Sequence, residues 1–248
     1  TRCAQAISED PAGLWEAAAG ADNLFVECGA IPKGATAARQ DVVAAPAAPV
    51  AVVAARPVFT AARLTAAPTV DGAVDEWPWQ ESTRVIAIAQ PPTGAPVTPA
   101  PGRACAAWDD RNLYLAVRLG LPKGTPPRGG TDFATCDGVE VSLRPSGGAV
   151  AGPTIVLWGS SDASYQALPA GGATPEQCKA YAARVTAEEW TCEWRIPFAA
   201  LPLDPGRAER LQFNLGAHLT ASAAWLAWQA TGGAFYEVEN AGDLRLAR

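Results

Sequence analysis

Four stretches of this chain alternate strictly between apolar residues and polar or small ones, and this pattern constrains the fold more than any other feature. They cover residues 113–119, 139–144, 190–196 and 211–220. A period of two places successive side chains on opposite faces of a β-strand, one facing a core and one facing outward. Clean alternation of this kind is typical of antiparallel sheets with one solvated face. From about residue 61 onward the sequence therefore predicts an all-β domain.

Turn signals separate these stretches. Asp71-Gly72 predicts a tight turn, because Gly accepts a positive φ and Asp can bond its own backbone. Residues 109–112 predict a polar loop between two strands, and residues 186–189 predict a turn between two more. Pro197 should end a strand, since proline cannot donate to the ladder. We also expect Trp79, Trp108 and Trp194 to lie in the core or at its rim.

Residues 1–60 differ in composition and predict an N-terminal extension to a sandwich that occupies residues 61–248. A short helix is expected over residues 11–21, with Asp10 as its cap and Pro11 at its first position. A short strand is expected over residues 23–28. Residues 35–67 are rich in Ala, Pro and Val, a composition that favours extended chain.

Charge and hydropathy exclude two classes of partner. The net charge is -6, whereas a nucleic acid or an anionic membrane surface would require a basic stripe. The longest apolar stretch, residues 42–58, is broken by three prolines, so no membrane span is predicted.

Six cysteines predict three disulfides, because none stands in a C-x-x-C pair and one His is too few for a zinc site. Sequence order suggests Cys3–Cys28, Cys105–Cys136 and Cys178–Cys192, although six cysteines allow about 15 pairings. The alternative is free, buried cysteines in a reducing compartment. Scarce Lys, absent Met and many turn residues favour an oxidising one. Since the sequence starts at Thr1, we expect that a signal peptide was removed and that the protein is secreted, extracellular or at the cell surface.

The order of several short motifs resembles that of the family 9 carbohydrate-binding modules and of the wider DOMON-type sandwiches. The motifs include Val-Asp-Gly at 70–72, Trp-Asp-Asp at 108–110 and Asp-Gly-Val-Glu-Val at 137–141. The others cover residues 75–79, 112–114, 194–201, 213–215, 225 and 242–246. The resemblance spans about residues 65–248 and implies an antiparallel β-sandwich of the immunoglobulin or jelly-roll kind, with a sugar as its ligand.

The resemblance also implies where a sugar would bind. The modules hold a terminal sugar between two aromatic rings, which fall here at Phe133 and at Phe235 or Tyr236, with Glu140 at the matching carboxylate. The family's rings at these places are usually Trp, and this chain departs from that. The alternative is that these are ordinary rim aromatics.

Two further tryptophans, Trp225 and Trp228, have opposite parity, so at most one can face the core of a regular strand. An exposed tryptophan usually marks a contact surface, and Trp158, Trp225 and Trp228 are therefore further candidate ligand residues.

The sequence offers little for catalysis or cofactors. His218 stands alone without a G-x-S-x-G motif, and Glu188-Glu189 falls in a predicted turn, so we expect no enzyme. A haem is excluded because the chain has one His and no Met. No cofactor is expected. Calcium is the alternative, because oxygen ligands are present at Asp109, Asp110 and Asp137 without EF-type spacing.

Two functions remain open. The first is a secreted, non-catalytic sandwich that binds a terminal sugar or short glycan. The second is an extracellular structural subunit that assembles with copies of itself, with residues 50–55 added as a strand to a neighbour's sheet edge.

Overall fold

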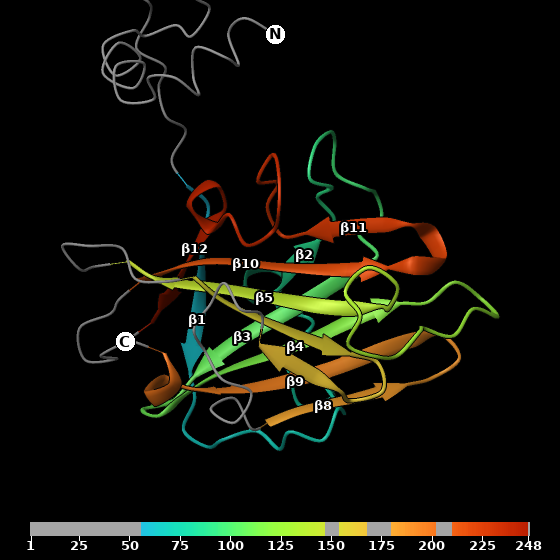
Figure 1. Ribbon diagram of the computed structural model, residues 1–248. Coiled ribbons are helices and arrows are strands. Elements are labelled where there is room, and N and C mark those ends of the chain that lie inside the picture. The colour runs from blue at the N-terminus through green and yellow to red at the C-terminus, as the bar shows by residue number, and fades with distance from the viewer. Residues whose placement is uncertain (1–55, 147–153, 168–179, 202–209, 248) are drawn as a thin grey trace, which may run out of the picture. The chain divides into compact units, whose positions relative to one another are not determined.

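The computed structural model describes residues 56–146, 154–167, 180–201 and 210–247. Within these ranges the elements are strands and short 3-10 turns, without an α-helix (Figure 1). None of the described residues belongs to a helix of the length and apolar character that a bilayer crossing requires. The helix expected over 11–21 and the strand expected over 23–28 lie outside these ranges. The predicted all-β class is confirmed.

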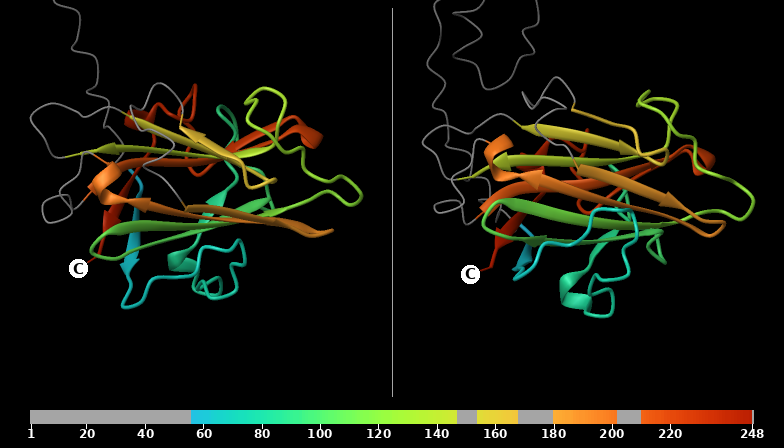
Figure 2. Two further views of the ribbon diagram at one scale, coloured as in Figure 1. Left: turned by 60° about the horizontal axis from the view of Figure 1, so that its bottom comes forward. Right: turned by 90° about the horizontal axis from the view of Figure 1, so that it is seen from below.

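The strands form two layers, which are seen edge-on in Figure 2. The first layer, sheet A, contains β7 (Tyr165–Ala167), β6 (Ile155–Ser160), β5 (Gly138–Pro145), β10 (Arg210–Leu219) and β12 (Gly242–Leu246), with β11 (Ala224–Ala227) paired to β10. The second layer, sheet B, contains β3 (Gly102–Trp108), β4 (Asn112–Gly120), β9 (Glu189–Pro197) and β8 (Ala180–Val185), with β2 (Ile86–Ile88) paired to β3.

One strand, β1 (Val58–Arg63), connects the two layers. Its first four residues pair with β12 in sheet A, and its last two pair with β3 in sheet B. Both pairings are parallel, which corrects the expectation of a purely antiparallel sandwich. A bridge between Gln90 and Ala227 links the layers elsewhere, so the whole is a nearly closed, sandwich-like sheet. The strand also crosses the domain boundary that the sequence placed between residues 60 and 61.

The core lies between the layers and is built by the apolar members of the four alternating stretches. The pattern holds because each strand turns alternate side chains inward. This cluster contains Leu113, Leu115, Val117 and Leu119 from β4, Val139, Val141 and Leu143 from β5, Trp190, Cys192, Trp194 and Ile196 from β9, and Leu211, Phe213, Leu215, Ala217 and Leu219 from β10. The predicted burial of Trp79, Trp108 and Trp194 is confirmed.

The outer faces differ from the sequence prediction, because they are covered. On β4 the outward Tyr114 and Ala116 are buried, and on β5 so are Glu140 and Ser142. Residues 64–85, which we call the covering segment, lie against the outside of sheet B (Figure 2). Alternation in the sequence therefore indicates which residues share a face of the strand, but it does not show that the face opposite the core is exposed to solvent.

The covering segment is held by a buried carboxylate on β9. Glu193 Oε2 accepts hydrogen bonds from the backbone N–H groups of Asp71 and Gly72, at 3.0 and 2.9 Å, and its Oε1 accepts one from Trp77 Nε1 at 2.9 Å. Burial raises the pKa of Glu193, and these three hydrogen bonds act in the opposite direction. Gly72 has a φ of 81°, and a Cβ there would lie 2.8 Å from the Ala183 carbonyl carbon.

The predicted turns are present. Asp71 Oδ1 accepts a hydrogen bond from the N–H of Ala73, which closes the turn that carries Gly72. Asp109 Oδ1 accepts in the same way from two backbone N–H groups of the 109–112 loop. The 186–189 turn joins β8 to β9 through the N–H of Thr186 and the carbonyl of Glu189 at 2.8 Å. β9 ends at Pro197, as expected.

The disulfide prediction is wrong where the structure tests it. Cys105, Cys136 and Cys192 are free and buried. Cys105 packs with Tyr114 beneath the covering segment, Cys192 lies in the main core, and Cys136 Sγ lies beside Gly130. Since the three thiols occupy separate environments, the expected Cys105–Cys136 bridge does not form. The other predicted partners, Cys3, Cys28 and Cys178, lie outside the described residues.

Removal of the Glu193 carboxylate should detach the covering segment. We expect Glu193→Ala to lower the free energy of unfolding by about 3 kcal/mol or more, because three donors, two of them buried, lose their acceptor. Chemical denaturation measures the change. Glu188→Ala, at an exposed position in the neighbouring turn, is the control and should change stability by less than about 0.5 kcal/mol. Equal losses in the two variants would contradict this role of Glu193.

Candidate functional site

Side chains suited to ligand contact gather on the outer face of sheet A. Strand register brings Trp158 of β6 opposite Glu140 of β5, and Glu140 opposite Gly216 of β10. The next row holds His218 of β10 opposite Trp225 of β11. All of these face away from the core, because they have the opposite parity to the core residues of the same strands.

Two glycines let large rings lie flat against this face. A Cβ on Gly138 would fall 1.8 Å from the Trp158 ring, and a Cβ on Gly216 would fall 2.3 Å from the Phe235 ring. Any larger residue at either position would displace the ring above it. The glycines therefore fix where Trp158 and Phe235 lie.

Phe133 completes a continuous group of rings. Its centroid lies 4.6 Å from that of Trp158 and 4.9 Å from that of Trp225, and Trp225 lies 5.9 Å from Phe235. Phe133, Trp158, Trp225 and Phe235 are called the aromatic cluster below. These separations are those of rings in direct contact, so Phe133 and Trp225 leave no slot for a pyranose between them.

The loop that carries Phe133 is tied down on both sides of the ring. Before it, the N–H of Gly130 donates to Ser160 Oγ at 3.0 Å, and Gln166 Nε2 donates to the Thr131 carbonyl at 2.8 Å. After it, the N–H of Ala134 donates to Asp132 Oδ1 at 3.0 Å. The ring is therefore presented in a preorganised position, which lowers the entropy cost of binding.

The loop that carries Phe235 is fixed from below by a buried amide. Asn214 Nδ2 donates to the carbonyls of Gln229 and Phe235, at 3.2 and 3.3 Å, and its Oδ1 accepts from the N–H of Gln229 at 3.2 Å. One side chain on β10 thus secures both ends of the segment that presents Phe235.

Glu140 lies opposite Trp158 of the aromatic cluster, and among the described residues its side chain accepts one hydrogen bond. Its side chain belongs to a residue that is only 2% exposed, and Ser142 Oγ donates to its Oε1 at 2.8 Å. Burial raises the pKa of Glu140 to about 7, and the Ser142 hydrogen bond partly offsets this rise. Nearby, the buried Nε1 of Trp158 has no hydrogen-bond partner among the described residues. A carboxylate can accept about four hydrogen bonds, so Glu140 is equipped to take more partners.

His218 is held in place by a ring contact and a hydrogen bond within the protein. Its ring stacks on Trp225 with centroids 3.9 Å apart and planes 13° apart, and its Nδ1 lies 3.0 Å from the Cys136 carbonyl oxygen. A carbonyl only accepts, so Nδ1 carries the proton. Burial lowers the pKa of His218, which keeps the ring neutral at physiological pH. His218 is thus a buried, hydrogen-bonded residue.

The structure brings together three of the five residues that the sequence nominated as ligand contacts, namely Phe133, Glu140 and Phe235. Tyr236 follows Phe235 and is 45% exposed. Trp228 is not part of the group, because it packs on the core side, 5.7 Å from Phe213 and 6.4 Å from Phe59.

The sequence also named Trp158 and Trp225 as candidates, and the structure places both in the aromatic cluster. The opposite parity of Trp225 and Trp228 predicted one inward and one outward ring, and this is confirmed. It did not show which was which. The register of β11 against β10 decides the matter, since it places Trp225 opposite His218.

The aspartates considered for calcium are engaged by the protein's own backbone. Asp109 accepts from the 109–112 loop, and Asp137 accepts from the N–H groups of Arg128 and Thr220. Within the ranges that the structure describes, no group of three or more His, Cys, Asp or Glu side chains could hold a metal ion.

Comparison with known proteins supports the fold. No protein-family model and no curated protein matches the chain. It is similar to a family 9 carbohydrate-binding module from Caldicellulosiruptor kristjanssonii in complex with cellotriose, with TM-score 0.55 and 16% identity over 77% of this chain and 93% of that one. The same kind of module with glucose gives TM-score 0.53 and 17% identity over 77% and 96%.

A third solved structure agrees. A putative carbohydrate-binding protein from Bacteroides uniformis gives TM-score 0.58 and 12% identity, over 78% of this chain and 100% of that one. At such identities the likeness shows a fold like that of the family 9 modules. The broader DOMON likeness stays a prediction.

Glu140 should make the protein less stable as the pH rises. Its pKa is higher in the folded state than the ordinary value, so folding retains a proton, and stability is lost between about pH 4.5 and pH 7. We expect Glu140→Gln to be more stable than the wild type at pH 8, by on the order of 2 kcal/mol, and nearly equal to it at pH 4. Urea denaturation at both pH values measures this. Glu81→Gln, at an exposed position, is the control, and a pH-independent difference for Glu140→Gln would contradict the prediction.

Proposed function

We propose that this protein is a secreted, non-catalytic carbohydrate-binding sandwich whose aromatic cluster binds a terminal sugar or short glycan. The observation that carries the proposal is the assembly of four aromatic rings above an under-bonded buried carboxylate, Glu140, on one face of sheet A. Aromatic faces stack on the apolar C–H face of a pyranose, and carboxylates accept hydrogen bonds from its hydroxyls. The similar structures from Caldicellulosiruptor kristjanssonii contain cellotriose and glucose.

The contact geometry indicates how the sugar would bind. Because Phe133 and Trp225 touch, the sugar stacks on their outward surfaces and does not enter between two facing rings. Both residues are half-buried, so each keeps exposed ring surface. The polar groups that this face offers to a sugar hydroxyl are Glu140 and the Nε1 of Trp158, both of which are buried.

The absence of catalysis is supported by the composition of the cluster. Glycoside hydrolysis commonly uses two carboxylates on either side of the scissile bond. The aromatic cluster encloses one, Glu140, while the nearby Asp137 is bonded to backbone N–H groups. Secretion is supported by composition alone, since the free Cys105, Cys136 and Cys192 remove two of the three expected disulfides. The assembly alternative involves residues 50–55, which lie outside the described residues.

Loss of either half-buried ring should weaken glycan binding. A glycan array identifies the ligand, and calorimetry then compares variants. We expect Phe133→Ala and Trp225→Ala each to weaken binding at least about tenfold, because each removes stacking surface. Trp225→Phe keeps a ring and should retain much of the affinity. Arg84→Ala, an exposed change on the covering segment, is the control. If the wild type binds no glycan, or if both alanine variants bind as the wild type does, the proposal fails.

Direct contact between Glu140 and a sugar hydroxyl should make binding pH-dependent. The pKa of Glu140 is raised to about 7, so the carboxylate becomes the stronger, ionised acceptor as the pH rises through that value. Affinity should therefore increase between pH 6 and pH 8 in the wild type and stay flat in Glu140→Gln. A parallel pH profile in the two proteins would show that Glu140 does not contact the ligand.

A further inference from the structure

A polar cavity lies on the outer face of sheet B, away from the aromatic cluster. Its volume is about 380 Å³, within the usual range of small-molecule sites. It opens between the chain that leads into β3 and the turn that joins β8 to β9. The lining residues that carry polar side chains are Arg103, Arg118, Thr186, Glu188 and Glu189.

Two arginines stand directly opposite each other at this cavity. Arg103 of β3 and Arg118 of β4 are register partners, and their guanidinium carbons lie 5.9 and 5.1 Å from the Trp79 ring. Trp79 itself is buried and donates to the Val74 carbonyl, so the platform beneath both cations is rigid. Cation–π contact of this kind holds a guanidinium in place.

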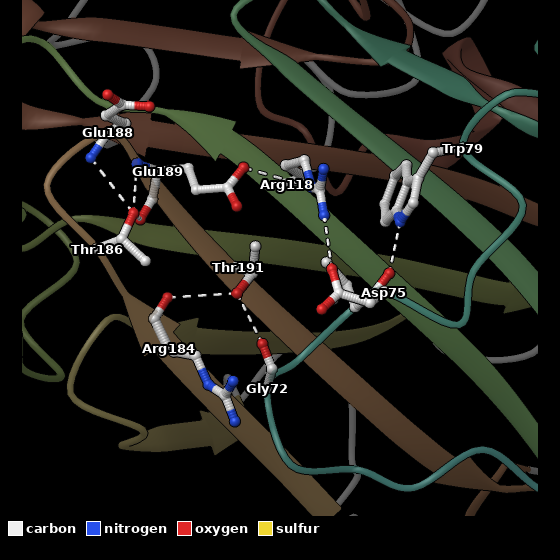
Figure 3. A network of polar contacts seen from close by, with 10 residues as sticks. Gly72, Asp75, Trp79, Arg118, Arg184, Thr186, Glu188, Glu189 and Thr191 are labelled. Atoms are coloured by element: carbon white, nitrogen blue, oxygen red, sulfur yellow. Dashed lines mark hydrogen bonds and ion pairs between the residues drawn. The ribbon is translucent and has the colours of Figure 1, made fainter.

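The charges of the two arginines are not equally compensated. Arg118 lies between two carboxylates, 3.5 Å from Asp75 and 3.4 Å from Glu189 (Figure 3). Arg103 is exposed and forms no ion pair within the described ranges. Arg118 is thus compensated by its own carboxylates, whereas the positive charge of Arg103 is open to a ligand anion.

The turn between β8 and β9 supplies the opposite kind of group. Thr186 Oγ1 caps the N–H groups of Glu188 and Glu189, at 3.3 and 3.1 Å, which fixes the turn (Figure 3). The exposed carboxylate of Glu188 borders the same cavity as Arg103. A multiply charged anion such as phosphate would be repelled by these two glutamates. A ligand with one carboxylate and several hydroxyls satisfies both sides of the cavity.

We propose that this cavity is a second ligand site, which binds the carboxylate of an acidic sugar through Arg103 and the sugar hydroxyls through Glu188. A guanidinium matches a carboxylate with two parallel hydrogen bonds, which a lysine cannot reproduce. The site stands apart from the aromatic cluster, since the two lie on the outer faces of different sheets. It does not depend on the function proposed for that cluster.

The test is a titration of the protein with sodium galacturonate, in which NMR chemical shifts report binding. We expect saturable binding by the wild type. The affinity should fall at least about tenfold in Arg103→Ala and by a smaller factor in Arg103→Lys. It should also fall when the NaCl concentration is raised from about 0.05 to about 0.5 M, because salt screens the charge of Arg103. Arg63→Ala is the matched control, because Arg63 is an exposed arginine 5.5 Å from the Trp108 ring on the same sheet. It should bind galacturonate as the wild type does.

Other ligands show whether the cavity selects an acidic sugar, and one further variant shows whether it is independent of the aromatic cluster. Galactose, acetate and phosphate should each bind at least about tenfold more weakly than galacturonate. The proposal is overturned if folded Arg103→Ala and Arg103→Lys bind galacturonate as tightly as the wild type does. It is also overturned if the wild type binds galactose or phosphate as tightly as galacturonate, or does not bind galacturonate at all. Trp225→Ala separates the two sites, because it should leave galacturonate binding intact even where it removes glycan binding at the aromatic cluster.

Discussion

The hydrogen bonds between Glu193 and the Asp71-Gly72 turn fix the covering segment on the outer face of sheet B. A carboxylate buried on β9 is tolerated because three donors, including Trp77 Nε1, surround it. This contact fastens the covering segment to sheet B and so buries Tyr114 and its neighbours. It also sets Trp79 beneath the arginine pair, so the polar cavity at the margin of sheet B depends on the same anchor.

The two buried glutamates of this protein form an instructive contrast. Burial raises the pKa of both, but Glu193 has three donors from the covering segment, whereas Glu140 has one, from Ser142. A buried carboxylate whose partners are all supplied by the protein stabilises the fold. One whose partners are missing costs stability and persists where a ligand supplies them. Glu193 therefore belongs to the scaffold, whereas Glu140 is the carboxylate that the proposed sugar site uses.

The sequence predicted the strands well because alternation is local, and each strand could be recognised from its own residues. It could not predict that Glu140 and Asn214 are buried, because the loops that cover them have no period. Parity showed that Trp225 and Trp228 diverge, but the direction depended on long-range register with His218. The cysteine pairing failed for the same reason, since sequence order carries no information about which cluster each thiol enters.

The aromatic cluster combines rings from loops with rings from strands. The loop positions that resemble those of the family 9 modules carry Phe133 and Phe235, which are smaller than the expected tryptophans. Two strand residues, Trp158 and Trp225, occupy the space beside them. The aromatic side chains of this face thus come from both loops and strands, and neighbouring rings are in contact. For the sugar site proposed above, the contact between Phe133 and Trp225 favours a sugar that lies across the cluster over one held between two rings.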